Sequence, residues 1–117
     1  MVCFALHGTA SAVSEGEIYE QGAAQEVREA LQQKEPLPWK KDGRVVPTAE
    51  VAKAIHRAVA GAAYGKAEVD KEQPFRAIRS GKYWVVFGSL PNGSFGGTAV
   101  TVIRASDGRV MRIIHGQ

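Results

Sequence analysis

The chain has 117 residues, of which 44% are hydrophobic and 23% charged, and its formal net charge is +3. This is the composition of one ordinary globular domain, and it excludes a disordered tail, a fibrous repeat and a multi-helix membrane protein. The single cysteine, Cys3, excludes an intramolecular disulfide and a zinc site built from cysteines.

The first thirteen residues resemble the end of a secretory signal. A short apolar stretch ends in Ala10-Ser11-Ala12, the small-x-small pattern that precedes a cleavage site. No Lys or Arg precedes this stretch, so either the true start lies upstream or the segment merely resembles a leader. We expect a leader-like segment over residues 1–13 and one α+β domain over residues 14–117. The location is periplasmic if the leader is a signal remnant and cytoplasmic otherwise, and no segment has the ~20 apolar residues of a membrane span.

Two helices are predicted in the first half of the chain. Ser14 and Glu17 form a capping box for a helix that ends near Gln33. Thr48 is the expected N-cap of the second helix, and Gly65 ends it. The side chains of the second helix that are expected to face the core are Val51, Ile55, Ala58, Val59 and Ala62.

After Pro74 the apolar period changes from helical to strand-like. Four strands are predicted at about residues 75–79, 82–90, 97–104 and 109–115, with tight turns at residues 80–81 and 107–108. Helices followed by strands indicate an α+β fold, with two N-terminal helices packed on a curved four-stranded antiparallel sheet.

Both faces of the predicted sheet are apolar, whereas a half-solvated antiparallel sheet alternates apolar and polar residues. In the second strand the side chains of one face are Tyr83, Val85 and Phe87, and those of the other are Trp84, Val86 and Leu90. The helices cover one face. The cover of the second face is the first helix, the curvature of the sheet, a second copy of the chain in a homodimer, or another protein.

The charges are divided unevenly along the chain. Residues 73–117 contain six Lys or Arg and one carboxylate, Asp107, a net charge of +5, whereas residues 1–72 have a net charge of −2. This asymmetry either serves solubility or indicates a surface that meets an acidic partner.

The residue types needed for catalysis or metal binding are not grouped. His7, His56 and His115 are far apart in sequence, and His56 is expected to be a satisfied surface or boundary residue of the second helix. The glycine-rich loop at residues 89–98 lacks the Lys-Ser/Thr of a phosphate loop, and the aromatic residues are not interleaved with basic ones as in a nucleic-acid platform. No catalytic, cofactor-binding or metal-binding residues are predicted, and Glu50 and Glu68 stay open as acid–base alternatives.

An ordered set of motifs resembles one known family, although no single motif is decisive. The motifs are Val46-Pro-Thr-Ala-Glu-Val-Ala-Lys-Ala-Ile55, Tyr64-Gly-Lys66, Gln73-Pro-Phe75, Tyr83-Trp-Val-Val-Phe-Gly-Ser-Leu-Pro91, Gly96-Gly-Thr98 and Asp107-Gly-Arg-Val110. They resemble the bacterial immunity proteins with the nuclear-transport-factor-2-like fold, which occur in polymorphic toxin systems. The resemblance implies a cone-shaped, cystatin-like sheet and a protein that binds and neutralises a cognate toxin without catalysis.

Five residues are the predicted anchors for a protein partner, because interfaces depend on buried aromatic and arginine side chains. They are Arg76, Tyr83, Phe95, Arg104 and Arg112. A two-residue turn at Asp107-Gly108 predicts that Arg104 shares one sheet face with Met111, while Arg112 shares the other with Ile103. On that register, the three arginines do not reach one partner through a single face.

Two other function classes are compatible with this architecture. One is a small-ligand binder or isomerase that uses the cone as a pocket, which requires a cavity with a polar group inside it. The other is a cystatin-like protease inhibitor, which also consists of a helix and an antiparallel sheet.

Overall fold

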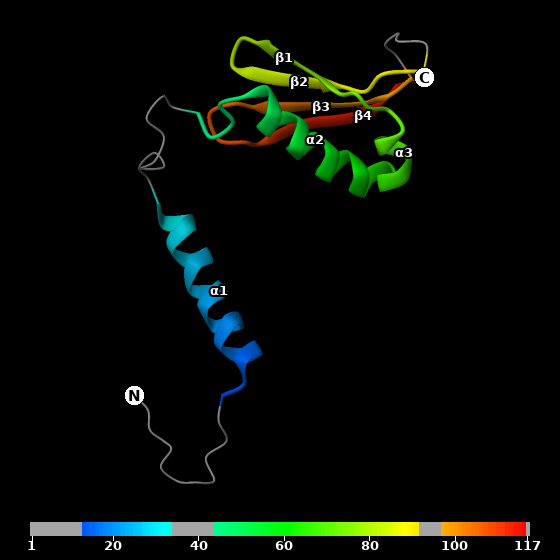
Figure 1. The fold of residues 1–117 in the computed structure, drawn as a ribbon. Coiled ribbons are helices and arrows are strands. Elements are labelled where there is room, and N and C mark those ends of the chain that lie inside the picture. Colours follow the sequence, from blue (N-terminus) through cyan, green and yellow to red (C-terminus); the bar gives the residue numbers. More distant parts are fainter. Residues whose placement is uncertain (1–12, 34–43, 92–96, 117) are drawn as a thin grey trace, which may run out of the picture. The chain divides into compact units, whose positions relative to one another are not determined.

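The structure is a computed structural model that describes residues 13–33, 44–91 and 97–116. Its elements are α1 (Glu15–Gln32), α2 (Ala49–Tyr64), α3 (Lys66–Asp70), β1 (Arg76–Ser80), β2 (Tyr83–Phe87), β3 (Ala99–Arg104) and β4 (Val110–His115). The chain divides into two compact units, Met1–Leu37 and Pro38–Gln117. The first unit contains α1, and the second contains all other elements (Figure 1).

Helix α1 begins at the predicted capping box. The backbone N–H of Glu17 donates to Ser14 Oγ at 3.0 Å, and the N–H of Ser14 donates to Glu17 Oε1 at 3.3 Å. No side chain of α1 is buried. The packing of this helix on the sheet stays a prediction, as does a domain boundary at residue 14.

Helix α2 begins at the predicted cap, where Thr48 Oγ1 accepts a hydrogen bond from the Val51 N–H. Gly65 ends the helix with a φ of 103°, a conformation that favours glycine, and α3 follows at once. Helix α3 is not predicted from the sequence. The guanidinium of Arg57 on α2 holds it through two hydrogen bonds to Asp70, of 2.8 and 3.0 Å.

The four strands form one antiparallel sheet in the order β1-β2-β3-β4, so the predicted α+β class is confirmed. Strand β2 is shorter than predicted. Its backbone leaves the ladder after Gly88, because the next N–H, that of Ser89, donates to the carbonyl oxygen of Glu72 at 2.7 Å. In the part of the chain that the structure describes, every helix is too short or too polar to traverse a lipid bilayer.

Helix α2 packs against the sheet through a stripe other than the predicted one. The buried residues of α2 are Ala52, His56 and Ala60, which recur at every fourth position. Val51, which was predicted to face the core, is 38% exposed, and Ile55 only borders the core. The prediction placed the larger aliphatic residues inward, but the two alanines bring the helix backbone close to the sheet.

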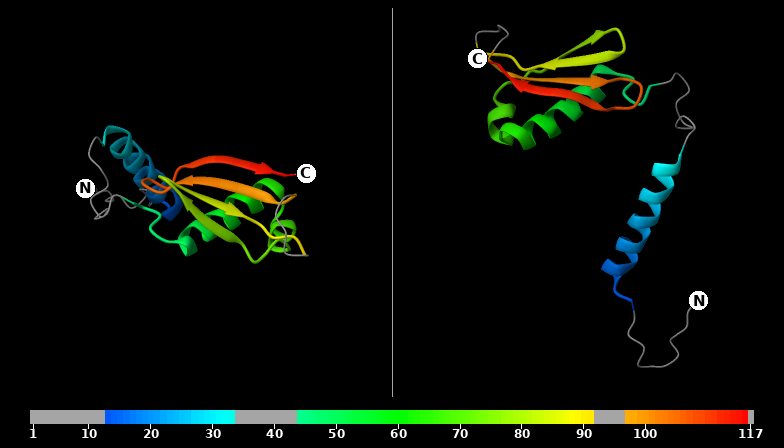
Figure 2. Two further views of the ribbon diagram at one scale, coloured as in Figure 1. Left: turned by 90° about the horizontal axis from the view of Figure 1, so that it is seen from above. Right: turned by 180° about the vertical axis from the view of Figure 1, so that it is seen from behind.

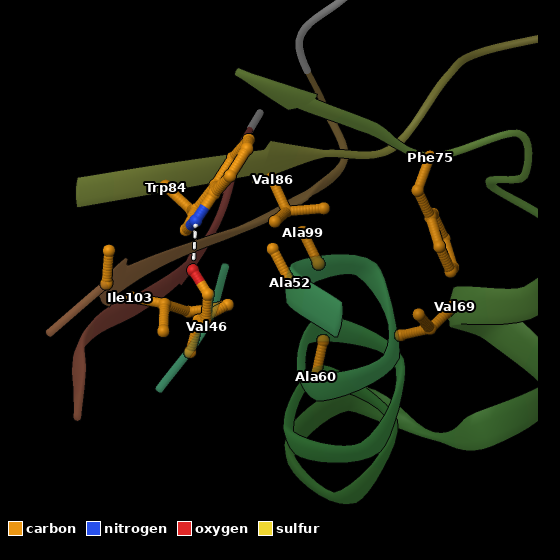
Figure 3. Close-up of a cluster of buried hydrophobic side chains, with 10 residues drawn as sticks. Val46, Ala52, Ala60, Val69, Phe75, Trp84, Val86, Ala99 and Ile103 are labelled. Carbon is orange, nitrogen blue, oxygen red and sulfur yellow. Dashed lines mark hydrogen bonds between the residues drawn. The ribbon is translucent and has the colours of Figure 1, made fainter. Parts of the chain in front are cut away.

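The core lies between α2, α3 and one face of the sheet (Figure 3). Trp84 and Val86 of β2 point into it, as does Ile103 of β3. The indole Nε1–H of Trp84 donates to the carbonyl oxygen of Val46 at 2.9 Å, which fastens the segment before α2 to the sheet.

Candidate functional site

The sheet face opposite α2 is not covered by any described element of the second unit (Figures 1 and 2). In this second unit α2 lies along the other face, and the pleat sends alternate side chains of each strand away from it. This surface is termed the open face. It consists of Arg76, Ile78, Ser80, Tyr83, Val85, Phe87, Val100, Val102, Arg104, Arg112 and Ile114.

The strand register arranges these side chains in rows with an apolar centre and an arginine at one end. The two rows that cross all four strands are Arg76–Phe87–Val100–Ile114 and Ile78–Val85–Val102–Arg112. The β2 and β3 members are half-buried by their neighbours, and Ile78 on the edge strand β1 is 50% exposed. An apolar centre with a charged rim is the usual composition of a protein–protein interface.

The position of Arg112 depends on a β-bulge. Ile103 pairs with Val110, but the residue before it in β3, Val102, pairs with Arg112, so that β4 has Met111 as an extra residue between the two pairs. One inserted residue moves every following side chain to the opposite face of the sheet. Without the bulge, Arg112 would point toward α2 together with Ile103, as the sequence prediction had it.

The three arginines that were predicted as anchors therefore share the open face. The expectation that they are divided between two faces is wrong. Arg76 lies at the β1 edge and Arg112 at the β4 edge, and both are exposed. Arg104 lies opposite Tyr83 in the remaining row. The two edge arginines thus flank the apolar centre from opposite sides.

The charge of Arg104 is compensated by Asp107. Its guanidinium Nε lies 2.9 Å from Asp107 Oδ1, and a second nitrogen contacts Oδ2. Asp107 Oδ1 also accepts the backbone N–H of Arg109. The hydrogen bonds from Arg104 lower the pKa of Asp107 to about 2, and the same pair raises the pKa of Arg104. Arg104 therefore stiffens the β3–β4 turn.

The two remaining predicted anchors are the aromatic residues Tyr83 and Phe95. Tyr83 lies half-buried on the open face, at the start of β2. Phe95 lies outside the described residues, as do Cys3 and His7. The structure thus brings four of the five predicted anchors to one surface.

His56 is a core residue, which corrects the prediction that it is a surface or boundary histidine. Its ring is fully buried, with Nδ1 2.7 Å from Thr101 Oγ1 and the ring edge-on to Phe75 at 4.7 Å. Among the described residues, Nε2 has no hydrogen-bond partner. Burial lowers the pKa of His56, and the nearby charge of Glu72 offsets this effect only in part. The sequence signal was its place between Ala52 and Ala60, four residues from each.

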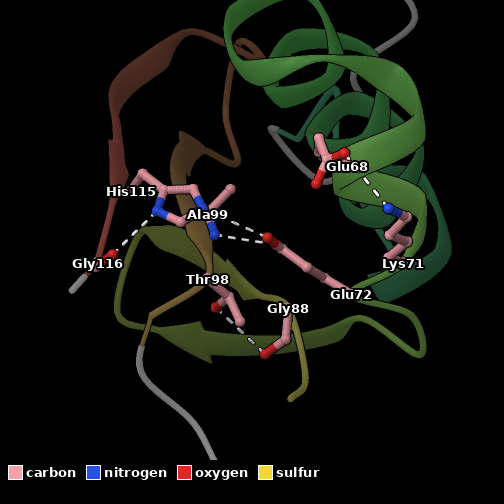
Figure 4. Close-up of polar contacts among 8 residues, drawn as sticks. All are labelled: Glu68, Lys71, Glu72, Gly88, Thr98, Ala99, His115 and Gly116. Atoms are coloured by element: carbon pink, nitrogen blue, oxygen red, sulfur yellow. Dashed lines mark hydrogen bonds and ion pairs between the residues drawn. The ribbon is translucent and has the colours of Figure 1, made fainter. Parts of the chain in front are cut away.

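Glu72 is a partly buried carboxylate that sequence reasoning did not single out, and its contacts are structural (Figure 4). Oε1 accepts the backbone N–H of Ala99 at 3.0 Å, and Oε2 lies 3.4 Å from His115 Nε2. The side chain is 14% exposed. Glu72 therefore links the end of α3 to the start of β3 and to the end of β4.

The two carboxylates that were open as acid–base alternatives lie on helix surfaces. Glu50 pairs with Lys53 at 3.5 Å and Glu68 with Lys71 at 3.4 Å, and both glutamate side chains are more than half exposed. Neither belongs to the open face or to the buried core. Within the described ranges, no three His, Cys, Asp or Glu side chains are grouped so that they could hold a metal ion.

A shallow groove of about 460 Å³ lies on the second unit away from the sheet. It is lined by residues on the outer side of α2 and at the start of α3, namely Ala54, Arg57, Ala58, Gly61, Ala62 and Lys66. His56 does not line it. The space between α2 and the sheet is instead filled by core side chains such as Trp84 and Ile103.

A family model described as NTF2 fold immunity protein matches residues 51–117, which is more than half of the chain. The match spans nearly all of α2, together with α3 and the four strands. No curated protein and no solved structure shows significant similarity to the chain.

Proposed function

Since the chain belongs to the family of NTF2-fold immunity proteins, we propose that it binds a cognate bacterial toxin and neutralises it through this contact alone, without catalysis. The toxin would belong to a polymorphic toxin system, as the sequence motifs imply. Family membership carries the proposal.

The packing of the second unit supports a binding role rather than chemistry in a pocket. An isomerase or ligand binder of this architecture needs a cavity between helix and sheet with a polar group that contacts the substrate. Here that space is occupied by Trp84, Val86 and Ile103. The buried ring of His56 faces Thr101 and Phe75. The carboxylate of Glu72 contacts the backbone N–H of Ala99 and the ring of His115.

Co-expression tests the proposed function. The gene is expressed in a bacterial host together with the toxin encoded by the adjacent open reading frame, and growth and co-purification are measured. We expect the toxin alone to stop growth and the pair to grow and to co-purify as a stable complex. Growth arrest in the presence of a folded, abundant immunity protein would refute the proposal.

The same proposal includes a place of action. The Ala10-Ser11-Ala12 pattern supports a periplasmic location. Cell fractionation of the natively expressed protein tests this, with a periplasmic fraction of the shortened chain as the expected result. Recovery of the uncleaved chain in the cytoplasm would refute it.

A further inference from the structure

We draw no further inference here: the strongest candidate, the apolar patch on the sheet face opposite α2, carries none because nothing in the structure shows what covers that face.

Discussion

Replacement of His56 by Gln should remove a pH dependence of folding stability that the wild-type protein shows between about pH 7.5 and about pH 5.5. The ring of His56 is fully buried between α2 and the sheet. Thr101 contacts Nδ1, while Nε2 has no partner among the described residues. A second proton on this ring would therefore be buried without an acceptor, and burial lowers the pKa of His56 below its ordinary 6.5.

The sign of the effect follows from where the proton binds. The unfolded chain takes up a proton on His56 as the pH falls through 6.5, but the folded chain does not until a lower pH. The free energy of unfolding therefore decreases as the pH falls from neutral through 6.5. The slope approaches about 1.4 kcal/mol per pH unit between the two pKa values, so the loss between about pH 7.5 and about pH 5.5 is at most about 1.4 kcal/mol. The negative charge of Glu72 reduces this loss, because it raises the pKa of His56.

Urea unfolding at a series of pH values measures the effect, with tryptophan fluorescence as the signal. The glutamine of His56→Gln does not titrate and retains an amide that can contact Thr101, so its stability should change less over this range than that of the wild type. His115→Gln is the control, since it removes a histidine whose side chain is 40% exposed at the end of β4. An undiminished loss of stability in His56→Gln would refute the assignment of the effect to this buried ring.

Three further substitutions test the fold. Gly88→Ala should cost about 1–3 kcal/mol in thermal or urea unfolding, because its Cβ would lie 2.7 Å from Cβ of Glu72; an unchanged midpoint would contradict this packing. Trp84→Phe should cost about 1–3 kcal/mol, since the buried carbonyl of Val46 loses its donor, and a nearly neutral effect would show that the hydrogen bond does not matter. Ser14→Ala should lower the local stability of α1 by about 0.5–2 kcal/mol, measured by amide hydrogen exchange, whereas Ser14→Asp should retain the cap.

The fold class was predictable because local signals agree with the final structure. Ser14 and Thr48 act as N-caps where the sequence places them, and the strands follow the change of period after Pro74. Helix α3 was missed, since five residues are too few for a periodic pattern. Its contacts with the rest of the fold are tertiary, namely the buried side chain of Val69 and the pair between Arg57 and Asp70.

The inward face of α2 was not predictable from hydrophobicity. A ranking by side-chain size favours Val51 and Ile55 as core residues, yet the helix buries Ala52 and Ala60 on either side of His56. The choice depends on how closely the helix approaches the sheet and on the hydroxyl of Thr101 across the interface. Both are tertiary properties, and they override the local apolar pattern.

The composition of the open face depends on a shift of one residue in the pairing of β3 with β4. The predicted anchors were chosen from the sequence by residue type, since exposed arginine and aromatic side chains suit an interface. Their distribution could not be read from the sequence, because a bulge at Met111 reverses the direction of Arg112 and no glycine marks it. The alternation rule gave the correct faces for β2 and β3, where pairing is regular, and failed in β4 after the bulge.

A protein-binding surface leaves little signature in a single sequence, and the reason is physical. A catalytic or metal site needs specific residue types at fixed spacing, whereas an interface needs only apolar area, a charged rim and a fixed orientation. In this protein the bulge supplies the orientation, because it brings the cation of Arg112 to the face that already contains Arg76 and Arg104. A two-residue change in loop length at the β3–β4 turn would leave that parity intact. Deletion of Met111 would reverse it, so the face on which Arg112 lies depends on the length of β4 and not on the composition of the turn.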